Sequence, residues 1–176
     1  MFYVYALAVV VLMIAAFLAY VATRPSDFRI VRSARMTAPP ARVFEEVNAL
    51  KNWEKWSPWA RLDPAMVQAY AGPPEGVGSF YSWLGNSKVG EGKMTITDSR
   101  PPAFVRIKLE FLKPFKATNT TDFEFKGQGH ATLVTWSMTG TNNFVAKIFC
   151  TFMNMDKMVG KDFEKGLASL RAVVEG

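Results

Sequence analysis

The side chains most often used in acid–base and nucleophilic catalysis are scarce in this chain. It contains one histidine, His130, and one cysteine, Cys150. With a single histidine and a single cysteine, a catalytic Cys–His pair is not expected. A metal site built from several His or Cys ligands is excluded. His130 follows Gly127-Gln128-Gly129, which is typical of a turn, and Cys150 lies in an apolar run that indicates a small buried hydrophobe. We therefore predict no catalytic histidine or cysteine, no metal site and no cofactor.

Glu91 and Tyr81 are the remaining candidates for acid–base chemistry. Glu91 lies between Gly90 and Gly92, and glycines allow other groups to approach a carboxylate closely. Glu91 could face an internal cavity as an acid or a ligand anchor, with Tyr81 as a second acid–base group. The alternative is a turn carboxylate that accepts hydrogen bonds from backbone amides. No convergent set of polar side chains accompanies either residue, so we predict no defined catalytic site.

Large apolar side chains are abundant and suit a different task, the binding of a hydrophobic molecule. Aromatic residues make up 14% of the chain, and such residues line either a filled core or a ligand cavity. The alternatives are core packing for all of these side chains and, for the tryptophan-rich segment 53–59, a lid. The predicted ligand-binding residues are Trp56, Trp83, Phe111, Phe123, Trp136, Phe149, Phe152 and Met153.

The charge distribution argues against a nucleic-acid partner. The chain of 176 residues has 21 Lys and Arg against 15 Asp and Glu, a net charge of +6. These basic residues are scattered singly along the expected strands, as Arg106 and Lys108 are, without an arginine-rich helix or a basic-aromatic sheet signature. We therefore expect no binding of DNA or RNA.

The elements that position these side chains are mainly strands. Short segments in which apolar and polar residues alternate are separated by connections that contain Gly or Pro. Such alternation is typical of an antiparallel sheet with one buried face. The seven predicted strands cover residues 28–36, 66–70, 79–84, 92–98, 104–112, 116–125 and 131–139.

The predicted helices lie after the first strand and at the C-terminus. Pro39-Pro40 favours a helix start, an apolar stripe follows up to Leu50, and the tryptophan-rich segment 51–64 suits a second short helix or turn. Residues 143–174 contain no proline and repeat apolar residues in steps of three, four or seven, which predicts one long amphipathic helix of about 45 Å. Within it, Gly160 and Gly166 mark either close packing or a bend.

The N-terminal segment predicts a membrane anchor. Residues 1–22 carry no charged side chain and are long enough to cross the hydrocarbon core as a helix. A cleaved signal peptide is the alternative, although the segment has no basic start and its apolar stretch is longer than a typical signal. Arg24 and the arginines after it favour a single-pass protein with its domain in the cytoplasm; a periplasmic or other extracytoplasmic domain is the alternative. The expected organisation is an anchor at 1–22, a linker at 23–27 and a domain at 28–174.

The order of these elements and several local motifs resemble a known group. The order is strand, two short helices, six strands and a long C-terminal helix. The motifs are Ala38-Pro39-Pro40-Ala41-Arg42-Val43-Phe44, Trp53-Glu54-Lys55-Trp56-Ser57-Pro58-Trp59, Tyr81-Ser82-Trp83-Leu84-Gly85-Asn86 with Gly90-Glu91-Gly92, and Asp162-Phe163-Glu164-Lys165-Gly166-Leu167. They are similar to the polyketide cyclase/dehydrase-like branch of the START (SRPBCC) superfamily. The resemblance implies an α+β helix-grip fold, in which a curved antiparallel sheet wraps around the C-terminal helix.

The resemblance also implies a deep apolar cavity between the sheet and the long helix, as the superfamily uses for lipids, sterols and polyketides. It implies no particular chemistry, because one fold serves many functions. The leading hypothesis is a membrane-anchored module that binds a hydrophobic small molecule or lipid in that cavity. One alternative is a cyclase or dehydratase that uses Glu91 or Tyr81. Another is a structural or regulatory partner with a filled core.

Overall fold

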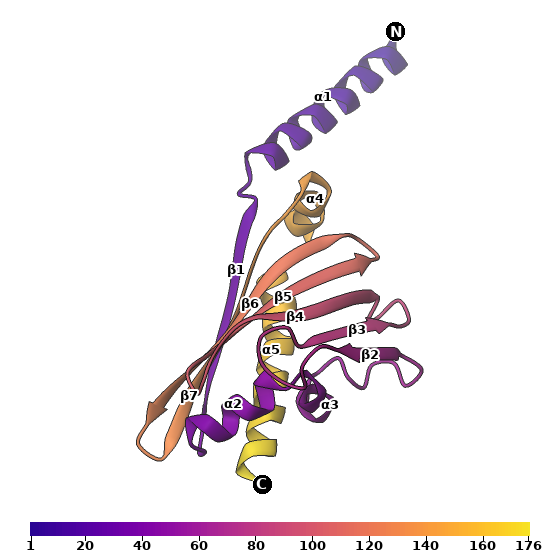
Figure 1. Ribbon diagram of the computed structural model, residues 1–176. Coiled ribbons are helices and arrows are strands. Elements are labelled where there is room, and N and C mark those ends of the chain that lie inside the picture. The colour runs from indigo at the N-terminus through magenta and orange to yellow at the C-terminus, as the bar shows by residue number, and fades with distance from the viewer.

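The computed structural model describes residues 1–176 and contains one separate helix and a twisted sheet with helices packed against it (Figure 1). The helices are α1 (Phe2–Thr23), α2 (Pro40–Asn48), the short 3-10 helix η1 (Leu50–Asn52), α3 (Trp53–Trp56), α4 (Phe144–Phe152) and α5 (Met155–Glu175). The strands are β1 (Asp27–Met36), β2 (Val67–Ala71), β3 (Phe80–Leu84), β4 (Glu91–Arg100), β5 (Phe104–Lys113), β6 (Ala117–Gln128) and β7 (Ala131–Thr141). The seven predicted strands and the short helices after the first strand are confirmed.

The seven strands form one antiparallel sheet in the order β1-β7-β6-β5-β4-β3-β2. The first strand pairs with the last, so β1 and β2 lie at opposite edges of the sheet. The segment of α2, η1 and α3 connects these two edges, and α2 packs on β5, β6 and β7 as it crosses. One face of the sheet, the inner face, is thereby covered by helices.

The alternation of apolar and polar residues separates this inner face from a charged outer face. Inner-face residues such as Ile107 and Phe123 are fully buried. On the outer face, Arg106 forms an ion pair with Asp122 at 2.8 Å, and Lys108 forms one with Glu110 at 3.0 Å. Because successive side chains of a strand point to opposite faces, the predicted pattern fixes which residues can meet in the core.

The tryptophans of α3 are part of that core. Trp53 and Trp56 are buried, and their rings lie 4.5 Å apart. Each indole N–H donates a hydrogen bond to a backbone carbonyl of α2, Trp53 to Val47 at 3.0 Å and Trp56 to Glu46 at 3.1 Å. A buried indole needs such an acceptor, so these bonds fix α3 against α2.

The C-terminal helix is not continuous, and the expectation of one helix over residues 143–174 is wrong on this point. The backbone leaves the helical region at Met153 (φ −119°, ψ 127°), and a new helix begins after Asn154. The Asn154 side chain accepts a hydrogen bond from the Lys157 amide at 2.9 Å, and Asn143 caps α4 in the same way through the Ala146 amide. Asparagine is a preferred N-cap residue, so a helix start inside the apolar pattern accounts for the break.

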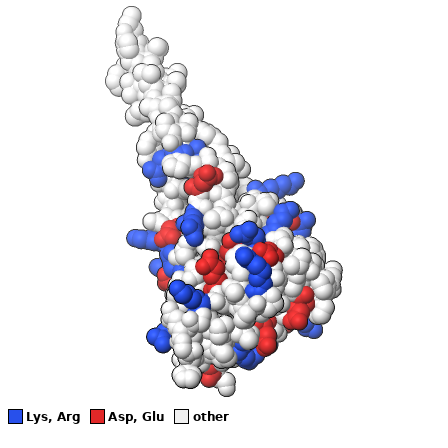
Figure 2. Space-filling view, turned by 60° about the vertical axis from the view of Figure 1, so that its left-hand side comes forward, with Lys and Arg blue, Asp and Glu red and all other residues white.

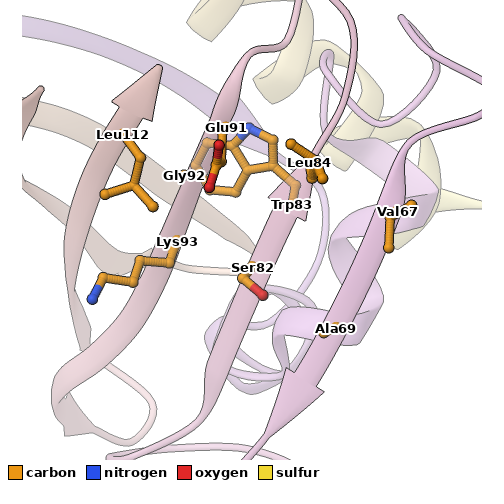
Figure 3. A pocket seen from close by; sticks show the side chains of 9 residues that line it. All are labelled: Val67, Ala69, Ser82, Trp83, Leu84, Glu91, Gly92, Lys93 and Leu112. Atoms are coloured by element: carbon orange, nitrogen blue, oxygen red, sulfur yellow. The ribbon is translucent and has the colours of Figure 1, made fainter. Parts of the chain in front are cut away.

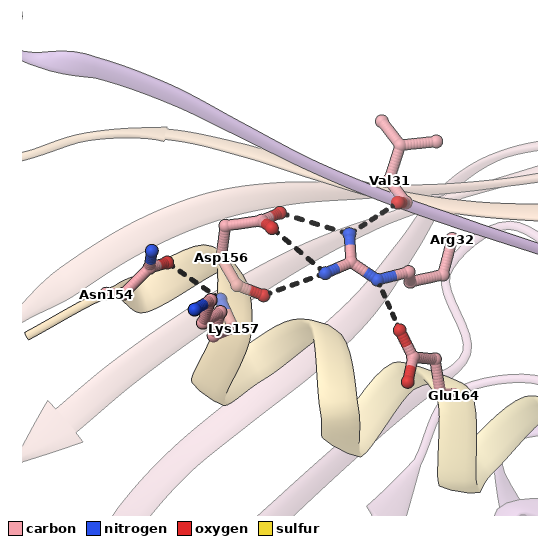
Figure 4. Close-up of polar contacts among 6 residues, drawn as sticks. All are labelled: Val31, Arg32, Asn154, Asp156, Lys157 and Glu164. Carbon is pink, nitrogen blue, oxygen red and sulfur yellow. Dashed lines mark hydrogen bonds and ion pairs between the residues drawn. The ribbon is translucent and has the colours of Figure 1, made fainter.

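Arg32 of β1 fixes the start of α5 to the sheet (Figure 4). Its guanidinium donates to both carboxylate oxygens and the carbonyl of Asp156, to Glu164 at 2.8 Å and to the Val31 carbonyl at 2.8 Å. Gly160 lies directly over this guanidinium, where a Cβ atom would overlap it. Gly166 likewise lies against the Trp136 ring. The two glycines therefore mark close packing rather than a bend.

The N-terminal helix α1 stands apart from the sheet (Figure 1). It is 22 residues long with a mean hydropathy of 2.7, long and apolar enough to cross a membrane. A signal sequence would have the same properties. Only Arg24, Pro25 and Ser26 separate α1 from β1.

Candidate functional site

The centre of the space between the sheet and α5 is filled by side chains. Trp136 is 2% exposed and stacks on Phe163 of α5 with ring centroids 4.0 Å apart and planes at 7°. Phe123 stacks on Trp136 at 4.8 Å, and Trp56 packs edge-on against both rings. Three of the predicted ligand-binding residues thus lie in a packed core. The cavity implied by the resemblance is closed where α5 crosses the sheet.

Burial decreases across the inner face from β7 toward β2, and a row of aromatic side chains lies along this gradient. Tyr70, Tyr81, Trp83 and Phe111 form this row, which we call the aromatic row. Successive ring centroids lie 5.0, 5.7 and 6.1 Å apart. Tyr70 is 39% exposed and the other three are partly exposed. The row is therefore a continuous, partly exposed surface of rings on the inner face of the sheet, and it is most exposed at Tyr70.

Strand register explains why these four residues share one face. Tyr70 pairs with Tyr81, and both belong to edge-proximal strands. Trp83 pairs with Gly92, which in turn pairs with Phe111. A Cβ atom at position 92 would overlap the Trp83 ring, so glycine makes room for the indole. The Trp83 N–H donates to the Val89 carbonyl at 3.0 Å, which fixes the ring orientation.

The two tyrosines remain protonated at neutral pH. Desolvation raises the pKa of Tyr81 to about 12, and the nearby Glu54 carboxylate adds to the effect. Desolvation also raises the pKa of Tyr70, whose hydroxyl donates to Glu54 at 2.8 Å. A protonated phenol can donate a hydrogen bond to a ligand oxygen but is a poor general base. The end of the row formed by Tyr70 and Tyr81 therefore combines phenol hydroxyls with apolar rings.

Glu91 lies on the other side of the sheet from this row. It pairs with Leu84 and lines a shallow pocket of about 160 Å³ on the outer face, together with Ser82, Lys93 and Leu112 (Figure 3). Its carboxylate lies 2.7 Å from the Lys113 ammonium. Tyr81 pairs with the inner-face residue Met94. The structure therefore does not bring Glu91 and Tyr81 together as an acid–base pair.

Two buried polar groups on the inner face lack a hydrogen-bond partner. They are the hydroxyl of Thr121 and the indole N–H of Trp136. Thr121 pairs with Met138 on one side and Ile107 on the other, so its surroundings are apolar. Burying an unpaired hydroxyl costs about 1–3 kcal/mol.

The last three predicted ligand-binding residues lie on α4 and the residue after it. Phe149, Phe152 and Met153 are all exposed, Phe152 by 76%. They lie at the end of the sheet nearest α1 (Figure 1), where no residue of α4 is buried. Ligand binding by the eight predicted residues stays a prediction.

Tyr70 is a member of the aromatic row that the sequence alone did not predict. Alternation placed it at the end of a short strand but could not show which residue of the next strand lies beside it. Alternation puts Tyr70 on the same face of its strand as Gln68. In the structure these two residues pair with Tyr81 and Trp83 of the neighbouring strand, Tyr70 with Tyr81 and Gln68 with Trp83. Only the register between β2 and β3 places these rings in one row.

The antiparallel sheet, the helices between its two edge strands and the C-terminal helix across its inner face define a helix-grip protein. The family profile described as polyketide cyclase/dehydrase and lipid transport matches residues 27–175. The chain therefore belongs to this family. No curated protein sequence matches the chain significantly.

Solved structures share the fold at low sequence identity. The di-domain ARO/CYC protein BexL from the BE-7585A biosynthetic pathway is 13% identical with a TM-score of 0.65, over 89% of this chain and 52% of that one. The KanY protein is 17% identical with a TM-score of 0.63, over 85% and 99%. The Aha1 dimer protein of Colwellia psychrerythraea is 18% identical with a TM-score of 0.55, over 84% and 96%. These likenesses extend to the fold alone.

Proposed function

We propose that the domain binds a hydrophobic small molecule or lipid against the aromatic row and is held at a membrane by α1. The observation that carries the proposal is the row itself. Four adjacent rings on the concave side of the sheet leave part of their apolar surface in water. Covering apolar surface contributes about 25 cal/mol for each Å², so a ligand that shields the rings gains affinity from burial.

The ends of the row suggest how such a ligand would be oriented. The hydroxyl of Tyr81 lies toward the solvent end and can donate to an oxygen of the ligand, whereas the Tyr70 hydroxyl already donates to Glu54. The Phe111 end adjoins apolar residues such as Leu109 and suits a hydrocarbon portion. This arrangement favours an amphipathic molecule with one oxygen-bearing end.

The membrane part of the proposal is supported by the length and composition of α1. Its 22 residues would extend about 33 Å, close to the thickness of the hydrocarbon core. Arg24 follows the helix directly, and the positive-inside bias therefore favours a cytoplasmic domain. Protease added outside intact cells should then leave the domain uncut. Cleavage in intact cells would place it on the outside.

A second candidate, a cyclase or dehydratase, is favoured by the family and by the ARO/CYC likeness of BexL. Tyr81, protonated at neutral pH, could donate a hydrogen bond to a substrate carbonyl. The test is to incubate the protein with a linear poly-carbonyl compound. Ring closure by the wild type that is lost in Tyr81→Phe would support this candidate. An unchanged substrate would count against it.

A photoactivatable fatty acid tests the proposed binding surface directly. The full chain would be placed in nanodiscs with a diazirine-bearing long-chain fatty acid, irradiated and mapped by mass spectrometry. We expect labelled peptides from the aromatic row. Phe111→Ala should lower labelling of the row by about threefold or more, since it removes a ring from the surface.

Phe80→Ala is the matched control for this experiment. Phe80 is also partly buried in the sheet, but it pairs with Thr95 and faces the outer side. Its replacement should leave labelling unchanged. Labels confined to α1 and α4, or an equal loss in both variants, would contradict binding at the row.

A further inference from the structure

Helix α4 is an apolar helix that the domain leaves uncovered. None of its nine residues is buried, although most of them are apolar. Phe144, Val145, Phe149 and Phe152 are all exposed by 45% or more. An apolar helix of a water-soluble domain normally buries one face against a core. What covers α4 must therefore come from outside the sheet.

The position of α4 points to what that cover is. The Phe152 ring lies 5.7 Å from the ring of Phe17 in α1, and the Lys147 ammonium donates to the Ala22 carbonyl at 3.3 Å. α4 therefore packs beside the last turns of the helix that we propose to span the membrane. Figure 1 shows α4 at the end of the sheet from which α1 departs.

The short linker restricts how far this end of the domain can lie from the membrane. Only three residues separate α1 from β1, and an extended chain covers about 3.5 Å per residue, so β1 begins within about 14 Å of the end of α1. With α1 across the bilayer, the α4 end of the sheet faces the lipid headgroups. The opposite end, with the β6–β7 turn, points away from them.

The turn between β5 and β6 extends the same surface. Phe115 in this turn is 63% exposed, and its ring lies 5.9 Å from that of Phe149. Lys116 follows it, and Lys113, which forms an ion pair with Glu91, precedes it. No acidic residue occurs in the turn or in segment 142–155, which carries Lys147. In Figure 2 α1 is uncharged along its length, whereas charged side chains of both signs are spread over the visible face of the domain.

We infer that α4 and Phe115 form a membrane-facing surface that inserts into the headgroup region of the bilayer in which α1 is anchored. The inference rests on the anchor in the proposed function. Aromatic side chains and lysines suit this depth, because rings favour the interface and lysine ammonium groups reach up to lipid phosphates. Phe111 ends the aromatic row close to the turn that carries Phe115. A lipid could thus enter the row from the bilayer without crossing water.

Site-specific fluorescence in vesicles tests this surface in the full chain. Cys150→Ser removes the single cysteine, and Val145→Cys then places an environment-sensitive NBD label on α4. Vesicles of phosphatidylcholine and phosphatidylglycerol would carry a nitroxide near the headgroups of some lipids. We expect a blue-shifted emission and about twofold or greater quenching by the nitroxide.

Val77→Cys is the matched control. Val77 is 59% exposed against 52% for Val145, but it lies in the loop before β3 beside the end of α2. Its label should stay in water and unquenched. Equal signals at both positions would overturn the inference. A shielded label at position 145 without nitroxide quenching would also overturn it, since the cover would then be protein.

A label at Val9→Cys separates this inference from the anchor. Val9 lies in the first half of α1 and is 54% exposed. Quenching at position 9 by nitroxides on lipid acyl chains, with none at position 145, would keep the anchor and reject the membrane-facing surface. No quenching at position 9 would reject the anchor itself.

Discussion

At the residue scale, the chemistry of the domain is that of aromatic rings with a few phenol hydroxyls. Catalysis needs groups that meet at one point, but Glu91 is paired with Lys113 near the outer face while Tyr81 lies on the inner face. The side chains that do meet are Tyr70, Tyr81, Trp83 and Phe111. Their shared property is apolar area with hydrogen-bond donors at one end, which suits binding.

The raised pKa of Tyr81 gives a prediction about alkaline pH. Its pKa of about 12 in the folded protein exceeds the ordinary value of 10.0, because burial disfavours the phenolate. The neutral phenol therefore contributes stability that is fully present below pH 10 and is lost as pH rises through about 12. The phenolate absorbance of the wild type minus that of Tyr81→Phe should show one transition near pH 12. A difference transition near pH 10 would mean that Tyr81 is fully hydrated.

Residue identities alone could indicate part of the site. The tryptophans and phenylalanines marked an apolar function, and the single His and Cys argued against several catalytic classes. Sequence could not separate Trp136, which fills the core, from Trp83, which is partly exposed, because both alternate correctly within their strands. The distinction depends on which part of the inner face α5 covers, and that is set by tertiary packing.

At the element scale, strands were easier to predict than the C-terminal helix. Strand ends carry Gly or Pro, and alternation continues up to them, so all seven strands lie close to their predicted positions. The break at Met153 has no proline or glycine to mark it. Its cause is Asn154, a residue that is also tolerated on an exposed helical position. An apolar periodicity therefore continues across two separate helices.

The contact of Gly166 with Trp136 gives a prediction about α5. A Cβ atom at position 166 would lie 2.7 Å from the Trp136 ring, which is itself stacked on Phe163 and has little room to move. Gly166→Ala should lower the free energy of unfolding by about 1–3 kcal/mol, although alanine favours a helix.

Ser169→Ala is the control for this change, because Ser169 is exposed on the same helix. We expect it to be neutral or slightly stabilising in chemical denaturation. If Gly166→Ala were stabilised to the same extent, the Trp136 ring would have to be free to move away from Gly166, which would contradict its close packing between α5 and the sheet.

At the scale of the whole molecule, three apolar features lead from the N-terminal helix into the domain. α1 is apolar enough to cross a membrane, α4 and Phe115 form an uncovered apolar surface beside its end, and the aromatic row runs from there across the concave face of the sheet. On the other side of the helix break at Met153, Arg32 holds α5 to β1 through ion pairs with Asp156 and Glu164. The domain thus has a firmly packed half and an apolar half that faces the proposed membrane.

The central claim is that the domain holds a hydrophobic molecule, and the most direct measurement is the mass of what it carries. The full chain would be purified from its host membranes in mild detergent and analysed by native mass spectrometry, beside Phe111→Ala and Phe80→Ala. We predict a bound small molecule that organic solvent releases, retained by Phe80→Ala and reduced in Phe111→Ala. A chain free of any such molecule, with a stably co-purifying protein in its place, would contradict the account.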